Sequence, residues 1–141
     1  MSATRTAQAH WEGTLFEGKG QVALESSGVG TFDVSWPART ESSSGMTSPE
    51  ELIAAAHSSC FNMQLSNTLV KAGSTADTLD TRADVTFQPG EGITSIHLTV
   101  RGAVPGMSVE DFVVAAEDAK ANCPVSKALT GTSITVDASL A

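Results

Sequence analysis

The most reactive side chains of this chain belong to its two cysteines, Cys60 and Cys123. A thiolate is a strong nucleophile toward peroxides and disulfides, and its formation depends on the charges and dipoles around the sulfur. Structural disulfides are rare in a reducing cytoplasm, where a cysteine pair is more often reduced, metal-bound, catalytic or redox-sensing. Two unrelated buried thiols, each packed as a small apolar side chain, are the alternative interpretation.

Cys123 directly precedes Pro124, a pattern typical of the start of a helix. Free backbone N–H groups and the helix dipole favour a thiolate at such a position, and Lys120 and Lys127 lie close in sequence. A cysteine that merely fits at a helix start is the competing interpretation.

Cys60 is expected in the middle of a long helix, so its thiolate needs a charged partner from another segment. We single out Arg39, because its permanent positive charge can lower a thiol pKa and bind a peroxide oxygen. Glu50 is the candidate carboxylate that orients this guanidinium, since the helix cap occupies Glu51. A solvated Arg39 and a Glu50 that only complements the helix dipole are the alternatives.

The spacing of Glu50 and Cys60 limits how they can share a site. They are ten residues apart, which corresponds to about 15 Å along a helix axis. Either the helix is broken between them, or two chains contribute to one site. The second option implies a symmetric homodimer with this helix at its interface.

The elements that must position these residues begin with three short runs over 7–12, 21–25 and 31–36, separated by glycines. Apolar side chains alternate in them, which predicts a small antiparallel meander. A polar loop that contains Arg39 is expected over residues 37–47.

A long helix is predicted next. Ser48 as N-cap, Pro49 at the first helical position and Glu51 three residues after the serine form a capping-box pattern. The helix should run to about residue 72, because Gly73 favours the conformation that ends helices.

The rest of the chain alternates strand and helix patterns. The sequence predicts a β-hairpin over 83–87 and 96–100, a helix from Ser108 to about residue 122, a short helix over 123–130 and a strand over 134–138. Together these elements predict one α+β domain over residues 1–141.

Composition excludes several functions. The chain has 8 Lys and Arg against 16 Asp and Glu, a formal net charge of −8, which disfavours nucleic-acid binding. The longest apolar stretch, 52–56, is far too short for a transmembrane helix, so no membrane association is expected. Residues 1–10 lack the apolar core of a signal peptide, and we expect a cytoplasmic protein.

Other reactive patterns are weaker. His57 and Cys60 could share a helix face as metal ligands, but His10, His97 and Cys123 have no recognisable zinc spacing relative to them. The chain lacks a Cys-x-x-Cys motif, a phosphate-binding loop and the G-x-S-x-G context of a serine nucleophile. We therefore expect neither a metal nor another cofactor.

Three segments carry a resemblance to a known family: QAHWEG at 8–13, TSPEELIAAAHSSCF at 47–61 and ANCPVS at 121–126. Together they closely resemble the OsmC/Ohr family of hydroperoxide peroxidases, the osmotically inducible OsmC branch in particular. The resemblance covers essentially the whole chain. It implies an intertwined α+β homodimer, with antiparallel sheets wrapped around two long central helices and active sites at the subunit interface.

The resemblance also implies a role for each candidate residue. Cys60 corresponds to the peroxidatic cysteine and Cys123 to the resolving cysteine, while Arg39 and Glu50 correspond to the activating pair. The implied cycle forms a Cys60 sulfenic acid, then a Cys60–Cys123 disulfide that an external dithiol reduces. Related proteins suggest lipoyl groups as that dithiol.

The implied substrates are organic hydroperoxides, with hydrogen peroxide reduced more weakly. An apolar pocket for them could come from Met46, Leu52, Phe61 and Met63, although these are equally typical of a hydrophobic core. A dimer that binds a hydrophobic ligand or partner, with structural or redox-sensing thiols, is the non-enzymatic alternative. A disulfide-stabilised exported protein is a further alternative, which conflicts with the absence of a signal peptide.

Overall fold

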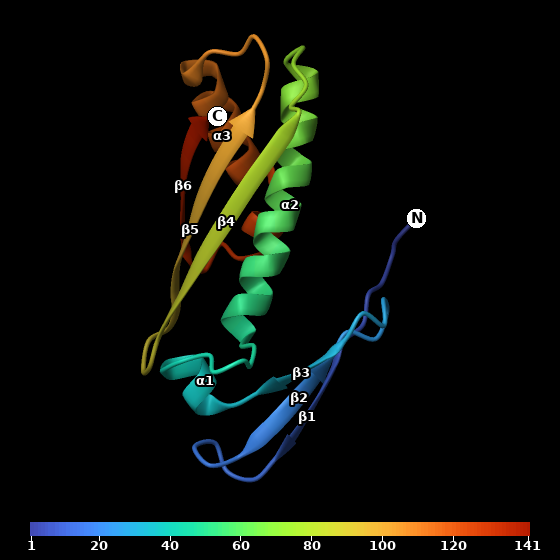
Figure 1. Cartoon of the computed structure of the whole chain (residues 1–141), viewed down its shortest axis with the longest axis vertical. Helices are drawn as coiled ribbons and strands as arrows, with labels where there is room; N and C mark the ends of the chain where they lie inside the picture. The colour runs from blue at the N-terminus through green and yellow to red at the C-terminus, as the bar shows by residue number, and fades with distance from the viewer. The chain divides into compact units, whose positions relative to one another are not determined.

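The computed structural model describes residues 1–141 and contains two three-stranded sheets and four helices. Figure 1 shows the order of these elements along the chain. They form two compact units, residues 1–52 and 53–141. The predicted α+β class is confirmed, whereas the prediction of one domain over 1–141 stays a prediction.

The first unit contains the predicted meander. Strands β1 (Gln8–Glu12), β2 (Lys19–Ala23) and β3 (Thr31–Val34) pair antiparallel in the order β1-β2-β3. This sheet has almost no core of its own, because only Gly20 and Glu50 are buried among residues 1–52. Three aromatic side chains are at least 40% exposed in this unit, namely Trp11, Phe16 and Phe32.

The predicted loop over 37–47 is wrong at its start, because α1 (Trp36–Thr40) is a short helix. The Ser35 side chain caps it by accepting a hydrogen bond of 3.2 Å from the Ala38 N–H. Pro37 supplies the fixed backbone angle that suits the first turn. Arg39 therefore lies on a helical turn instead of in an irregular loop.

Helix α2 (Pro49–Lys71) is the long helix that the sequence predicts. The Ser48 hydroxyl accepts a hydrogen bond of 3.1 Å from the Glu51 N–H, as an N-cap should. The predicted capping box forms only in part, because the Glu51 carboxylate accepts a hydrogen bond of 2.6 Å from the Thr47 hydroxyl instead. None of the helices combines the length and the apolar character needed to cross a membrane.

The C-terminal end of α2 is set by Gly73, whose φ of +86° lies in the left-handed region. The Ser74 N–H then donates a hydrogen bond of 2.9 Å to the Leu69 carbonyl, which satisfies one of the last carbonyls of the helix. This end lies within a residue of its predicted position.

The second unit contains the larger sheet. Strands β4 (Thr78–Gln88) and β5 (Gly92–Ala103) form the predicted antiparallel hairpin. Strand β6 (Ser133–Leu140) pairs with β5 in parallel, so the expectation of purely antiparallel sheets is wrong for this pair. Parallel neighbours need a long crossover connection. Helices α3 (Val109–Asn122) and α4 (Pro124–Ala128) provide it.

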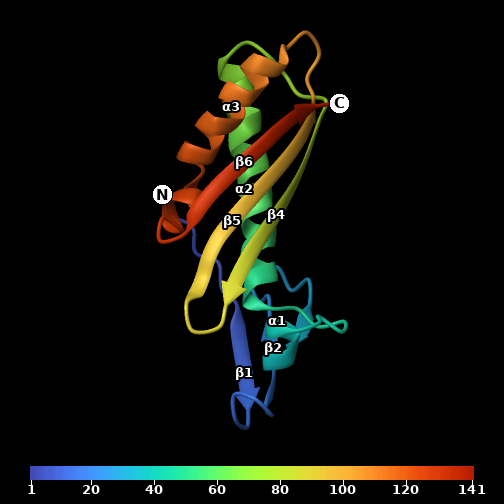
Figure 2. The same ribbon diagram turned by 90° about the vertical axis from the view of Figure 1, so that its left-hand side faces the viewer.

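One face of this sheet carries the hydrophobic core. Figure 2 shows α2 and α3 on the same side of strands β4, β5 and β6. The α3 helix approaches β5 closely, because a Cβ atom on Gly102 would lie 2.6 Å from the Phe112 ring. The buried core consists mainly of apolar side chains from α2, β5 and α3, which are Phe61, Leu65, Leu69, Ile96, Leu98, Val100, Phe112, Ala115, Ala116 and Ala119.

Candidate active site

The two cysteines lie side by side in the second unit. Cys60 is half-buried in α2, and Cys123 is buried at the junction between α3 and α4. Both are free thiols, and Cys123 lies close enough to Cys60 to act on the pKa of its thiol. The Val125 backbone N–H also lies close enough to the Cys60 sulfur to act on this pKa. The structure thus brings together two thiols that are 63 residues apart in the sequence.

The surroundings of Cys60 within one chain do not favour its thiolate. Burial raises the pKa of Cys60, and the hydrogen bond and charge of Cys123 raise it further, whereas the Val125 N–H lowers it. The net effect is a pKa above the ordinary value. A reactive thiolate at this position therefore needs a positive charge beside it.

Arg39 and Glu50 form an ion pair in the first unit, between α1 and the first turn of α2. The Arg39 Nε and Nη2 atoms lie 2.9 and 2.8 Å from the same carboxylate oxygen, Glu50 Oε1. The Glu50 side chain is only 9% exposed, and its Oε2 atom is buried without a hydrogen-bond partner. The Arg39 guanidinium also lies 5.9 Å from the centre of the Trp36 ring. These contacts hold the guanidinium in one orientation.

Helix α2 is unbroken between Glu50 and Cys60. This excludes a broken helix, which was one of the two ways in which Glu50 and Cys60 could share a site. A site that contains both residues needs a second copy of the chain, because their separation along one helix is about 15 Å.

A second polar contact lies next to the thiols, and the sequence analysis missed its role. His57 is fully buried on α2, and its Nε2 atom lies 2.7 Å from the Ser126 hydroxyl oxygen on α4. Its Nδ1 atom is buried without a partner, and burial lowers the pKa of His57. No group of three or more histidine, cysteine or acidic side chains is arranged to hold a metal ion.

A signal for this contact was available in the sequence. His57 precedes Cys60 by three residues, and Ser126 follows Cys123 by three, so each lies one helical turn from a cysteine. Residues with this spacing lie on the same side of a helix. Sequence reasoning considered His57 only as a metal ligand and gave Ser126 no role.

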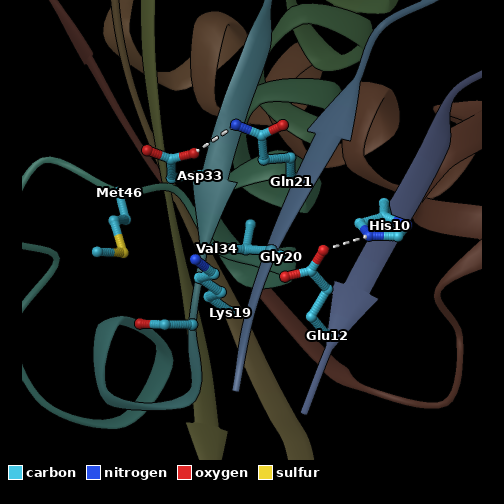
Figure 3. Close-up of a pocket in the computed structure, with 9 residues that line it drawn as sticks. His10, Glu12, Lys19, Gly20, Gln21, Asp33, Val34 and Met46 are labelled. Atoms are coloured by element: carbon cyan, nitrogen blue, oxygen red, sulfur yellow. Dashed lines mark hydrogen bonds and ion pairs between the residues drawn. The ribbon is translucent and has the colours of Figure 1, made fainter. Parts of the chain in front are cut away.

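The apolar residues considered as a pocket do not all serve that purpose. Phe61 belongs to the hydrophobic core of the second unit, whereas Met63 is 72% exposed. One cavity of the first unit, about 460 Å³, is lined by both polar and apolar groups and is drawn in Figure 3. It contains none of the four predicted site residues. Its lining consists of His10, Glu12, Lys19, Gly20, Gln21, Asp33, Val34, Ser35 and Met46.

The fold and the paired thiols define an α+β protein with two reduced cysteines in contact across its helices. Residues 41–139 match the model of the family described as OsmC-like protein. The chain is 43% identical over 140 residues to Peroxiredoxin OsmC of Escherichia coli (strain K12), with 97% of this chain and 96% of the relative covered. Peroxiredoxin OsmC of Shigella flexneri matches with the same values. The chain belongs to the OsmC-like family.

Solved structures of the same fold agree with this assignment. An organic hydroperoxide resistance protein OsmC from Legionella pneumophila matches with a TM-score of 0.70 and 22% identity, covering 99% of this chain and 97% of that one. The organic hydroperoxide resistance protein OhrB of Bacillus subtilis gives a TM-score of 0.70 and 22% identity, with 94% and 97% covered. At these identities the likeness confirms the fold.

Proposed function

We propose that this chain is a thiol peroxidase that reduces organic hydroperoxides, and hydrogen peroxide more weakly, with Cys60 as the attacking residue. The contact between Cys60 and Cys123 carries this proposal, because a peroxidatic cysteine needs a resolving thiol within reach. The names of the two relatives at 43% identity, both peroxiredoxins, support it. The role in defence against oxidative stress follows from this chemistry.

The reaction begins with the Cys60 thiolate, which attacks one oxygen of the hydroperoxide. The O–O bond breaks, the sulfur is oxidised by two electrons to a sulfenic acid, and the alkoxide leaves as an alcohol after it takes up a proton. The Cys123 thiol then attacks the Cys60 sulfur. The S–O bond breaks, water leaves, and a disulfide forms before further oxidation to sulfinic acid.

Arg39 is the proposed source of the positive charge that Cys60 needs, and Glu50 the residue that orients it. The unbroken α2 helix leaves only a second copy of the chain to supply them beside Cys60, so the proposed enzyme is a homodimer with interfacial sites. Two further observations support a partner. The first unit leaves Trp11 and Phe32 exposed, and Glu50 Oε2 is buried without a donor.

An external dithiol completes the cycle by exchange with the disulfide, which regenerates both thiols. A lipoyl-type dithiol is the proposed class of reductant. A reducing cytoplasm is the compartment that fits a cycle of this kind. The proposed cycle itself requires no metal or organic cofactor, because thiol chemistry accounts for every step.

The first test uses fully reduced protein and one equivalent of cumene hydroperoxide. We expect stoichiometric peroxide loss and a Cys60–Cys123 disulfide that a dithiol reverses, measured by intact mass and thiol count. Cys60→Ser should abolish peroxide loss, because the nucleophile is gone. Cys123→Ser should consume peroxide once and then stall or over-oxidise at Cys60, because nothing resolves the sulfenic acid.

The same experiment can also contradict the proposal. Two unreacted thiols and undiminished peroxide would contradict the peroxidase proposal. The dimer that binds a hydrophobic ligand would then be the function to test.

A further inference from the structure

The His57–Ser126 contact and the Cys60–Cys123 contact join the same two parts of the chain. His57 and Cys60 are one turn apart on α2, and Ser126 and Cys123 are three residues apart at the start of α4. Cys123 lies close enough to Cys60 to act on the pKa of its thiol, and His57 Nε2 lies 2.7 Å from Ser126 Oγ. The two contacts are therefore successive links between the same two elements.

The only other polar link described at this junction depends on the same register. The Val125 N–H, which opposes the effect of burial on the Cys60 pKa, belongs to the residue before Ser126. A shift of α4 along α2 would therefore move Cys123 and the Val125 N–H together relative to the Cys60 sulfur. The α4 helix has only five residues, and Ser126 is its buried residue.

The chemistry of His57 indicates a specific role. A fully buried imidazole with one nitrogen lacking a partner costs stability that an apolar side chain would not cost. Its pKa is lowered by burial, so the ring is neutral at pH 7 and offers one donor and one acceptor. The feature that sets the buried His57 apart from an apolar side chain is its short hydrogen bond with the Ser126 hydroxyl.

We infer that the His57–Ser126 hydrogen bond is a positioning contact that holds α4 in register on α2, so that Cys123 reaches oxidised Cys60 before a second peroxide does. The inference rests on the proposed function. In the step concerned, the S–O bond of the Cys60 sulfenic acid breaks, the S–S bond to Cys123 forms, and the hydroxyl leaves with the Cys123 proton as water. In this inference His57 and Ser126 act through the position of α4 and take no part in breaking the S–O bond.

The decisive variant is Ser126→Ala, which removes the hydroxyl and little volume. We expect disulfide formation after one equivalent of cumene hydroperoxide to slow by about tenfold or more, since small misplacement of reacting groups is costly. The sulfinic fraction at Cys60 should rise when excess peroxide is present, as read by mass spectrometry. The rate of the first oxidation should change far less than the rate of disulfide formation, because Cys123 takes part only in the second step.

Matched variants separate positioning from general stability. Thr81→Val removes a hydrogen bond of 2.6 Å from the Thr81 hydroxyl to Asn62, between β4 and α2, away from α4. Thr81→Val should lower the stability of the protein without slowing disulfide formation.

Further variants test the contact itself. Ser126→Thr keeps a hydroxyl and should form the disulfide at close to the wild-type rate. His57→Leu should slow resolution as Ser126→Ala does, and the double variant should add little, because both remove one contact.

A second readout does not require peroxidase activity. In glutathione redox buffers, the fraction of Cys60–Cys123 disulfide at equilibrium measures how well the two sulfurs are held together. Ser126→Ala should lower this equilibrium constant by about tenfold, and Thr81→Val should leave it unchanged. Equal constants and equal resolution rates for Ser126→Ala and wild type would overturn the inference. Loss of peroxide reactivity in wild type would instead overturn the proposed function alone.

Discussion

At the scale of single residues, His57 links the stability of the protein to pH. Burial lowers its pKa below the ordinary value of 6.5, so the unfolded chain takes up a proton at a higher pH than the folded chain does. The stabilising effect of the neutral ring is complete above pH 6.5 and is lost as the pH falls toward the folded pKa. We expect the free energy of unfolding to fall by up to about 1.4 kcal/mol per pH unit in that window.

The comparison that isolates this effect is His57→Gln, which cannot titrate. Urea unfolding of both proteins between about pH 5 and 7.5 should give a steeper loss of stability for wild type on acidification. Parallel curves would mean that His57 does not titrate differently in the folded and unfolded states.

The reactive residues of the site were easier to predict from the sequence than the contacts between them. Cys60 and Cys123 stand out because thiols are rare and reactive, and Arg39 because few basic residues are available. The contacts of these residues with one another could not be predicted, because such contacts depend on how distant segments pack. The His57–Ser126 contact joins residues 69 positions apart, and the spacing of each from a cysteine indicates this contact only once Cys60 and Cys123 are known to lie together.

At the scale of elements, Gly73 determines where α2 ends. Its φ of +86° is strained for any residue with a Cβ atom, although a Cβ there would meet no neighbouring atom. Gly73→Ala should therefore destabilise the protein by about 1 kcal/mol through backbone strain alone. Gly131→Ala is the matched control, because its surroundings are equally open and its φ is not in the left-handed region.

Chemical denaturation of the two alanine variants checks this prediction. The midpoint should fall for Gly73→Ala and stay near wild type, or rise slightly, for Gly131→Ala. Equal effects at both positions would show that the end of α2 does not depend on the left-handed residue.

Elements with local signals were predicted well, and elements defined by distant pairing were not. The cap at Ser48 and the stop at Gly73 gave α2 nearly its correct length, because both act within one helical turn. The parallel pairing of β5 and β6 was missed, since a strand's neighbours depend on the crossover between them. Trp36–Thr40 was assigned to a strand end and a loop, although Ser35 before Trp-Pro is a helix-start pattern.

At the scale of the whole molecule, the proposed dimer predicts that two inactive variants can restore each other. Arg39→Met lacks the charge, and Cys60→Ser lacks the nucleophile. In a mixed dimer, one site combines Cys60 of the first variant with Arg39 of the second, so about half of the sites in each mixed dimer should be active. Activity should be absent from each variant alone and appear after subunits are exchanged by mild denaturation and refolding.

Two controls make this test specific. Sedimentation should give a particle of twice the 14.5 kDa chain mass for every sample. In a mixture of Arg39→Met with the double variant Arg39→Met, Cys60→Ser, no site regains a guanidinium, and activity should stay absent. A mixture of the single variants that remains inactive as a verified mixed dimer would contradict a site shared between chains.

The sparse burial of residues 1–52 has a consequence for how the protein is made. These residues leave the ribosome before residues 53–141, yet only Gly20 and Glu50 among them are buried in the folded chain. Their three strands offer little apolar burial to offset the entropy lost on ordering, so this segment cannot become stable by itself early in synthesis. In the proposed dimer its folding is tied to the concentration of completed chains, so low expression prolongs the time that its strand edges are open to chaperones and aggregation.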